Sequence, residues 1–139
     1  MPSIGILKEL KDNKVFRVAL LFLFLILFLV TRLPRIKDDI VNPDGTNWHY
    51  RSEQFISGVK HKQFEKTYQH YHPGTTLMWV SGVGVEVFKQ VSGVKSYNSE
   101  NFLTFDLVAK VSVIFVQLIL SIFLIFLFSK LVGFYKSFL

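Results

Sequence analysis

The chain has 139 residues, of which half are hydrophobic and 15 are Phe, with no Cys and a formal net charge of +6. The absence of Cys excludes disulfide frameworks and thiolate metal sites. The basic residues are dispersed and alternate with acids, which favours contact with anionic lipid headgroups over a nucleic-acid partner. The apolar residues are clustered in long runs, which is typical of a chain whose solvent is lipid.

The first apolar run follows a basic segment, residues 1–17, which we predict to be cytoplasmic. From Val18 to Thr31 the sequence VALLFLFLILFLVT has no charge, and we predict a transmembrane helix over residues 18–33. The run ends without a small-x-small cleavage site, which favours an uncleaved signal anchor over a signal peptide. Arg17 and Arg32 can extend their charged ends outward and so lengthen this span.

Residues 34–102 are predicted to form an extracytoplasmic loop that carries two short interfacial helices. The sequence Asn42-Pro43-Asp44-Gly45 predicts a turn, because Pro suits an early turn position and Gly accepts positive φ. A helix capped by Thr46 or Asn47 should follow, with its amphipathic part over residues 48–59. A second helix is expected over residues 76–88, whose apolar run is too short to cross a bilayer comfortably.

A second transmembrane helix is predicted over residues 103–130, where 111–129 is uncharged. Asp106 and Lys110 are four residues apart and should pair on this helix. Gln117 and Ser121 add a thin polar stripe, which we expect to face protein or a cavity. Residues 131–139 would be a cytoplasmic tail or the start of a further region. We therefore predict an all-α integral protein of the plasma membrane with both termini cytoplasmic.

Asp44 is the first candidate for chemistry. It could act as a catalytic carboxylate beside a membrane span, or it could only stabilise a turn, where Asp is a favoured residue. Arg51 and Lys110 could bind a phosphate, or could form ordinary ion pairs and headgroup contacts.

The histidines and aromatic residues of the loop leave further alternatives. His70 and His72 could begin a metal site with His49 or His61, but spacing places no third ligand. No metal or other cofactor is therefore predicted, although a divalent ion stays an open alternative. Trp48 and its neighbouring aromatic residues could stack on a sugar, or could form an aromatic belt at the headgroups.

The order of motifs resembles a known family. After the first span come Asn42-Pro43-Asp44, then Arg51-Ser52-x-x-Phe55, then Thr67-Tyr68, then His72-Pro73-Gly74-Thr75-Thr76 and Met78-Trp79, and finally the second span. This order is similar to the N-terminal part of the GT-C membrane glycosyltransferases, in the group of protein O-mannosyltransferases and lipid A aminoarabinose transferases (family 39-like). The resemblance covers residues 16–129, nearly the whole chain.

The resemblance implies a sugar donor linked to polyprenyl phosphate and an extracytoplasmic acceptor. Asp44 matches the acidic residue that positions or activates the acceptor, and Gly45 stands where the family often has Glu. The candidate substrate-binding residues are Arg51, His72, Trp48 and Lys110. Family members have many more spans, so the resemblance implies an N-terminal portion that needs a missing C-terminal transmembrane region. The alternative is a non-catalytic two-span membrane protein whose loop binds a partner or lipid headgroups.

Overall fold

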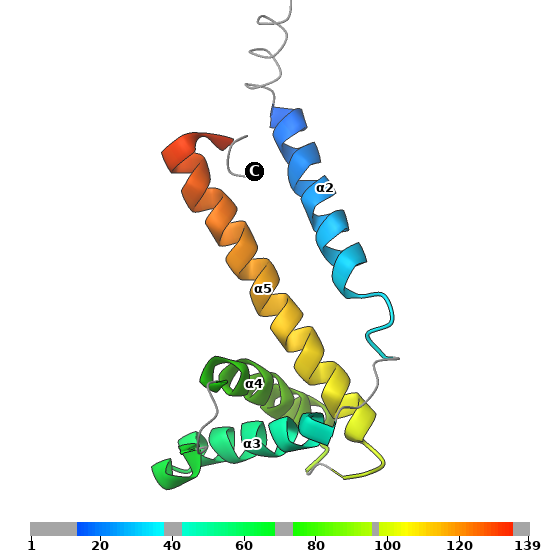
Figure 1. The fold of residues 1–139 in the computed structure, drawn as a ribbon, viewed down its shortest axis with the longest axis vertical. Coiled ribbons are helices and arrows are strands. Elements are labelled where there is room, and N and C mark those ends of the chain that lie inside the picture. Colours follow the sequence, from blue (N-terminus) through cyan, green and yellow to red (C-terminus); the bar gives the residue numbers. More distant parts are fainter. Residues whose placement is uncertain (1–13, 38–42, 69–73, 96–97, 135–139) are drawn as a thin grey trace, which may run out of the picture. The chain divides into compact units, whose positions relative to one another are not determined.

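The computed structural model describes residues 14–37, 43–68, 74–95 and 98–134. Over these ranges the chain is all-helical, in the order α2 (Lys14–Arg32), α3 (Pro43–Lys60), the short 3-10 helix η1 (Phe64–Thr67), α4 (Thr75–Ser92) and α5 (Phe102–Val132) (Figure 1). The helices fall into two compact units. One contains α2 and the part of α5 from Gln117 onward, and the other contains α3, η1, α4 and α5 up to Val116.

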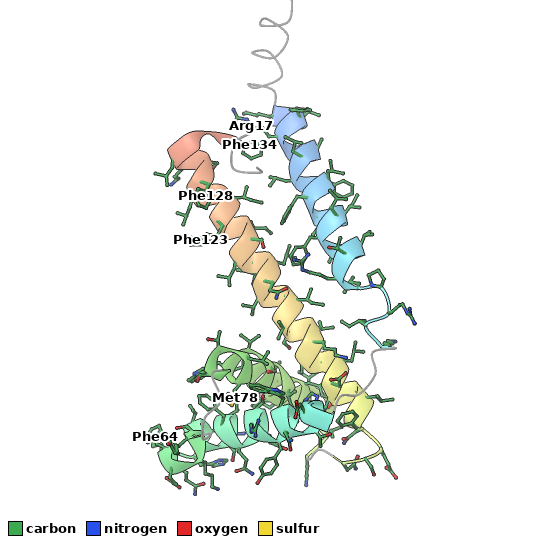
Figure 2. All side chains as sticks on the ribbon, viewed as in Figure 1. Arg17, Phe64, Met78, Phe123, Phe128 and Phe134 are labelled. Atoms are coloured by element: carbon green, nitrogen blue, oxygen red, sulfur yellow. The ribbon has the colours of Figure 1, made fainter. Side chains whose placement is uncertain are left out.

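Within the described part of the chain, α2 and α5 are the two helices that are long and apolar enough to cross a membrane. Their side chains extend outward on all sides, as Phe123 and Phe128 of α5 do (Figure 2), and these two rings are half-exposed. Apolar surface of this extent is rare on proteins dissolved in water. The sequence-based predictions of an all-α chain and of two candidate spans are therefore confirmed.

The helices extend beyond their predicted limits at most ends. α2 begins at Lys14, four residues before the predicted start, and α5 covers 31 residues. A helix of that length measures about 46 Å, whereas a bilayer core is about 30 Å thick. α5 is therefore long enough to cross and still contribute its first turns to the second unit. α4 ends at Gly93, whose φ of 74° is a left-handed conformation and whose N–H donates to the Lys89 carbonyl at 3.0 Å.

The two candidate spans contact each other through polar groups. Arg32 Nε donates to Gln117 Oε1 at 3.4 Å, and the Arg17 guanidinium lies 5.6 Å from the centre of the Phe134 ring (Figure 2 labels the latter pair). Gln117 thus contacts α2 at this one point, although its side chain is otherwise exposed. Ser121 instead donates to the Gln117 carbonyl of its own helix at 2.8 Å, so it needs no partner from another helix.

The turn predicted at residues 42–45 is wrong over the part that the structure describes. Pro43 is the first residue of α3, so Asp44 and Gly45 lie in the first helical turn, and Thr46 and Asn47 lie inside the helix and do not cap it. The physical reason is that Pro has no N–H to lose at the first helical position and its φ already suits a helix. An acidic residue in the same turn is also favoured by the helix dipole. The same residue types thus satisfy the rules for a turn and for a helix start.

The second unit has its core where α3, α4 and the start of α5 meet. Met78 is 1% exposed and packs with Phe55 and Ile56 of α3, while Phe105 of α5 is 2% exposed and packs with Val85 of α4. Aromatic pairs reinforce both clusters: Phe55 with Trp79 at 5.1 Å, and Phe88 with Phe105 at 5.8 Å, each close to edge-to-face.

Glycines allow these helices to approach closely. A Cβ added at Gly82 would overlap the Ile56 side chain and lie 2.9 Å from the Ser52 carbonyl oxygen of α3. At Gly84 it would overlap Ser112 Oγ and lie 2.6 Å from the Ser112 Cβ of α5. α4 therefore uses two nearby glycines to contact two different helices.

We predict that Gly84→Ala destabilises the second unit while Gly45→Ala does not. Both replacements gain about 1 kcal/mol of helix propensity. At Gly45 an added Cβ meets nothing within 4 Å, whereas at Gly84 it must displace α5. The free energies of unfolding of the two variants should differ by about 1–3 kcal/mol, measured by circular dichroism on the full chain in detergent. Equal stabilities would show that α4 does not pack on α5 at this point.

Candidate functional site

Three of the residues predicted to carry function lie on one side of α3. Asp44, Trp48 and Arg51 are spaced by four and seven residues, which brings them onto one face of a helix. Asp44 is exposed in the first turn, and the Arg51 guanidinium lies 5.8 Å from the centre of the Trp48 ring. Trp48 in turn covers Gly74 so closely that a Cβ there would overlap the ring. This side of α3 therefore combines a carboxylate, an aromatic ring and a cation.

Lys110 belongs to a different cluster, at the start of α5. Its Nζ lies 2.7 Å from Asp106 Oδ2, which confirms the pair predicted from sequence. The other carboxylate oxygen, Asp106 Oδ1, lies 3.1 Å from His49 Nε2 of α3. Because a carboxylate only accepts hydrogen bonds, His49 Nε2 is the donor in this contact. The ring of His49 also stands edge-on to Phe102 at 5.6 Å, so α3 and α5 are joined by one compact set of contacts.

The two groups occupy different sides of α3. At about 100° per residue, His49 lies about 140° around the helix from Asp44. His72, the remaining predicted substrate-binding residue, lies outside the described residues. The structure thus brings Asp44, Trp48 and Arg51 together and places Lys110 with Asp106 and His49. Within the described residues, no three His, Asp or Glu side chains gather in a way that would hold a metal ion.

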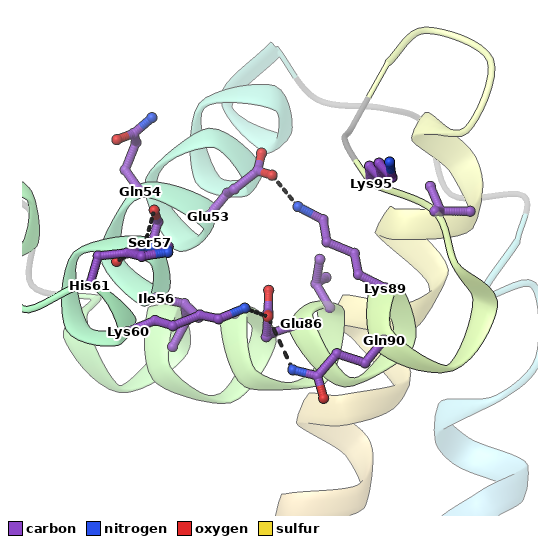
Figure 3. Close-up of a pocket in the computed structure, with 13 residues that line it drawn as sticks. Glu53, Gln54, Ile56, Ser57, Lys60, His61, Glu86, Lys89, Gln90 and Lys95 are labelled. Atoms are coloured by element: carbon purple, nitrogen blue, oxygen red, sulfur yellow. Dashed lines mark hydrogen bonds and ion pairs between the residues drawn. The ribbon is translucent and has the colours of Figure 1, made fainter.

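A polar groove lies between α3 and α4, with a volume of about 440 Å³ (Figure 3). Lys60 Nζ donates to Glu86 Oε1 at 2.5 Å across it, and Gln90 Nε2 donates to the same oxygen at 3.2 Å. A second ion pair joins the same two helices, with the lysine (Lys89) on α4 and the glutamate (Glu53) on α3. We call this the α3–α4 groove. Its further lining residues include Gln54, Ser57, His61 and Lys95.

The pKa of Glu86 is lowered from its usual value of 4.5, chiefly by the hydrogen bond from Lys60, while partial burial acts in the opposite direction. A carboxyl whose pKa is lower in the folded than in the unfolded chain stabilises the fold when the pH is above its pKa in the unfolded chain. That stabilisation is lost as the pH falls through its pKa in the folded chain. Glu86 is therefore ionised and bound to Lys60 at neutral pH. Since the pair is partly exposed, its contribution is at most about 1 kcal/mol.

Sequence reasoning missed most of these pairs. His49 and Asp106 are 57 residues apart, Glu53 and Lys89 are 36 apart, and Lys60 and Glu86 are 26 apart. Helical spacing identifies partners three or four residues apart, so it found only the Asp106–Lys110 pair. The sequence signal for the two Lys–Glu pairs is that α3 and α4 each carry one Glu and one Lys, and no comparable signal marks the His49–Asp106 pair.

Comparison of the chain with protein-family models, with curated proteins and with solved structures finds no match. The candidate site therefore has to be interpreted from its own geometry and from the motifs in the sequence.

We predict that the His49–Asp106 pair contributes more to the free energy of unfolding than the Lys60–Glu86 pair. The side chains of His49 and Asp106 are 11% and 20% exposed, whereas Lys60 is 52% exposed, so water screens the second pair more. In a double-mutant cycle with Ala replacements, the coupling free energy should be about 1–3 kcal/mol for His49–Asp106. The Lys60–Glu86 cycle should give about 0.2–1 kcal/mol.

Both cycles are measured by unfolding the full chain in neutral detergent, which keeps the conditions matched. A coupling for His49–Asp106 no larger than that for Lys60–Glu86 would contradict the prediction.

Proposed function

We propose that the chain is the N-terminal portion of a membrane glycosyltransferase, which transfers a sugar from a polyprenyl-phosphate donor to an extracytoplasmic acceptor. The observation that carries the proposal is the position of Asp44. This carboxylate is exposed in the first turn of the helix that follows a candidate span, and it shares a side of that helix with Trp48 and Arg51. The GT-C-like order of motifs supports the same reading.

In the proposed reaction an acceptor hydroxyl attacks the anomeric carbon of the donor sugar. A glycosidic C–O bond forms, the C–O bond to the lipid phosphate breaks, and the phosphate leaves with the bonding electrons. Asp44 takes the hydroxyl proton as general base. Its exposure suits this role, because an acceptor can reach the carboxylate.

Arg51 would stabilise the negative charge that develops on the departing phosphate. It lies seven residues after Asp44, which corresponds to about 10 Å along a helix. A sugar attached to a phosphate can span such a distance, with the sugar towards Asp44 and the phosphate towards Arg51. Trp48 lies between them on this side of α3. Lys110 pairs with Asp106 beside His49, on a different side of α3, and takes no part in this arrangement.

The proposal includes a location at the surface of the plasma membrane, with α3 and α4 on its extracytoplasmic side. α4 supports this, because Val83, Val87 and Val91 form an exposed stripe along it and are 46%, 54% and 84% exposed. We call these residues the valine stripe. An exposed apolar stripe beside polar residues on a helix is typical of a helix that lies in the headgroup region. The cavity for the lipid donor would be completed by further spans beyond this chain.

The alternative is a non-catalytic two-span protein whose helical loop binds a partner or lipid headgroups. The observation that favours it is the helix start at Pro43, because an acidic residue in a first helical turn is stabilising without any catalytic role. The reading frame downstream in the genome separates the two classes. Further hydrophobic spans in frame would favour the enzyme.

We predict that Asp44→Asn lowers the transfer rate by about 10²-fold or more in the full-length enzyme, because Asn preserves the shape of the side chain but cannot accept the proton. Glu100→Gln is the matched control. It removes one exposed carboxylate from the same unit and should leave the rate unchanged. A wild-type rate in a folded, inserted Asp44→Asn enzyme would refute the catalytic role.

We also predict that residues between the two spans are extracytoplasmic. The chain has no Cys, so a single introduced Cys is the sole reactive thiol. Ser99→Cys should react with a membrane-impermeant thiol reagent in intact cells, and Ser3→Cys should react only after permeabilisation. Labelling of Ser3→Cys alone in intact cells would reverse the orientation.

A further inference from the structure

The α3–α4 groove has a chemistry that the proposed transfer does not use. Glu53, Ser57 and Lys60 line it from α3, on the side of the helix opposite to Asp44 and Arg51. The groove is therefore separate from the proposed transfer site.

The charges of the groove favour an anionic ligand. Lys60, Lys89 and Lys95 line it against two glutamates, so positive charge is in excess. Each ammonium has three N–H donors, and a hydrogen bond to a glutamate oxygen uses one of them. Lys60 and Lys89 can therefore each donate a further N–H to a ligand while they remain paired with their glutamates. Lys95 adds a third ammonium from the residues after α4 (Figure 3).

The neutral polar groups of the groove suit hydroxyls or esters attached to that anion. Gln54, Ser57 and Gln90 contribute two amides and a hydroxyl to the lining. The volume of about 440 Å³ falls within the range of about 300–1,000 Å³ that is common for small-molecule sites.

The valine stripe lies directly beside the groove. Glu86 follows Val83 by three residues and Gln90 follows Val87 by three, and residues so spaced are neighbours on a helix surface. A ligand with its anion in the groove can thus lay an apolar part along the valine stripe. This pairing of a cationic polar groove with an exposed apolar stripe matches an amphipathic anion.

We propose that the α3–α4 groove binds the phosphate headgroup of an anionic phospholipid, whose acyl chains lie along the valine stripe. Lys60, Lys89 and Lys95 hold the phosphate, and Gln54 and Gln90 bond the headgroup hydroxyls. Binding of this kind fixes the depth at which α3 and α4 meet the bilayer.

The test uses the full chain in neutral detergent, titrated with short-chain phosphatidylglycerol and followed by native mass spectrometry. Lys60→Gln/Lys95→Gln is compared with Lys62→Gln/Lys66→Gln, which removes two lysines from the same unit but outside the groove. The groove variant should bind phosphatidylglycerol about 30-fold more weakly, and the control less than about threefold more weakly. Equal losses in the two variants would overturn the proposal.

Two further arms identify the ligand. Phosphatidylcholine should bind the wild type more weakly than phosphatidylglycerol, and millimolar inorganic phosphate should fail to displace the lipid. Displacement by inorganic phosphate, or equal binding of the two lipids, would overturn the assignment to an anionic phospholipid.

Two more variants distinguish a loss of binding from a folding defect. Lys60→Arg/Lys95→Arg keeps both charges and should retain binding. Lys95→Gln alone leaves both ion pairs between α3 and α4 intact and should weaken binding about fivefold. Unchanged binding in Lys95→Gln would count against the proposal even if the double variant fails to fold. None of these measurements involves sugar transfer, so their outcome is independent of the proposed enzymatic function.

Discussion

The close approach of α4 to α3 and α5 is the contact on which the second unit depends. Gly82 and Gly84 lack side chains at the two points where the neighbouring helices come nearest. Around these points the largest buried side chains, Met78 and Phe105, fill the space. Ion pairs then form at the edges of the contact, because the same approach brings lysines of one helix within reach of glutamates of the other. A bulkier residue at Gly82 would push α3 and α4 apart and so disturb both the packing and the ion pairs between them.

The two units differ in the surface that they expose. α2 and most of α5 expose Leu, Ile and Phe on every side, which is typical of helices that cross a membrane. The second unit buries a small apolar core and surrounds it with charged groups. The two surfaces for which a function is proposed lie on different sides of α3: the proposed transfer site at Asp44 and Arg51, and the α3–α4 groove at Lys60.

The carboxylates of Asp106, Glu86 and Asp44 have different surroundings in the second unit. Asp106 lies between His49 and Lys110, and Glu86 accepts hydrogen bonds from Lys60 and Gln90. These carboxylates join helices. Asp44 lies in the exposed first turn of α3. A carboxylate that an acceptor can reach is what a general base requires, so the proposed role agrees with this exposure.

The sequence by itself determined the helical class, the two apolar spans and the Asp106–Lys110 pair, because hydrophobic runs and i,i+4 spacing are local properties. It placed Trp48 and Arg51 on one helix but left Asp44 in a turn before it, because it mistook the helix start at Pro43 for a turn. Only the tertiary structure decided which side chains meet across helices, such as His49 with Asp106. Those contacts depend on the distance and rotation of one helix relative to another, set by the glycine approaches, and no local spacing encodes them.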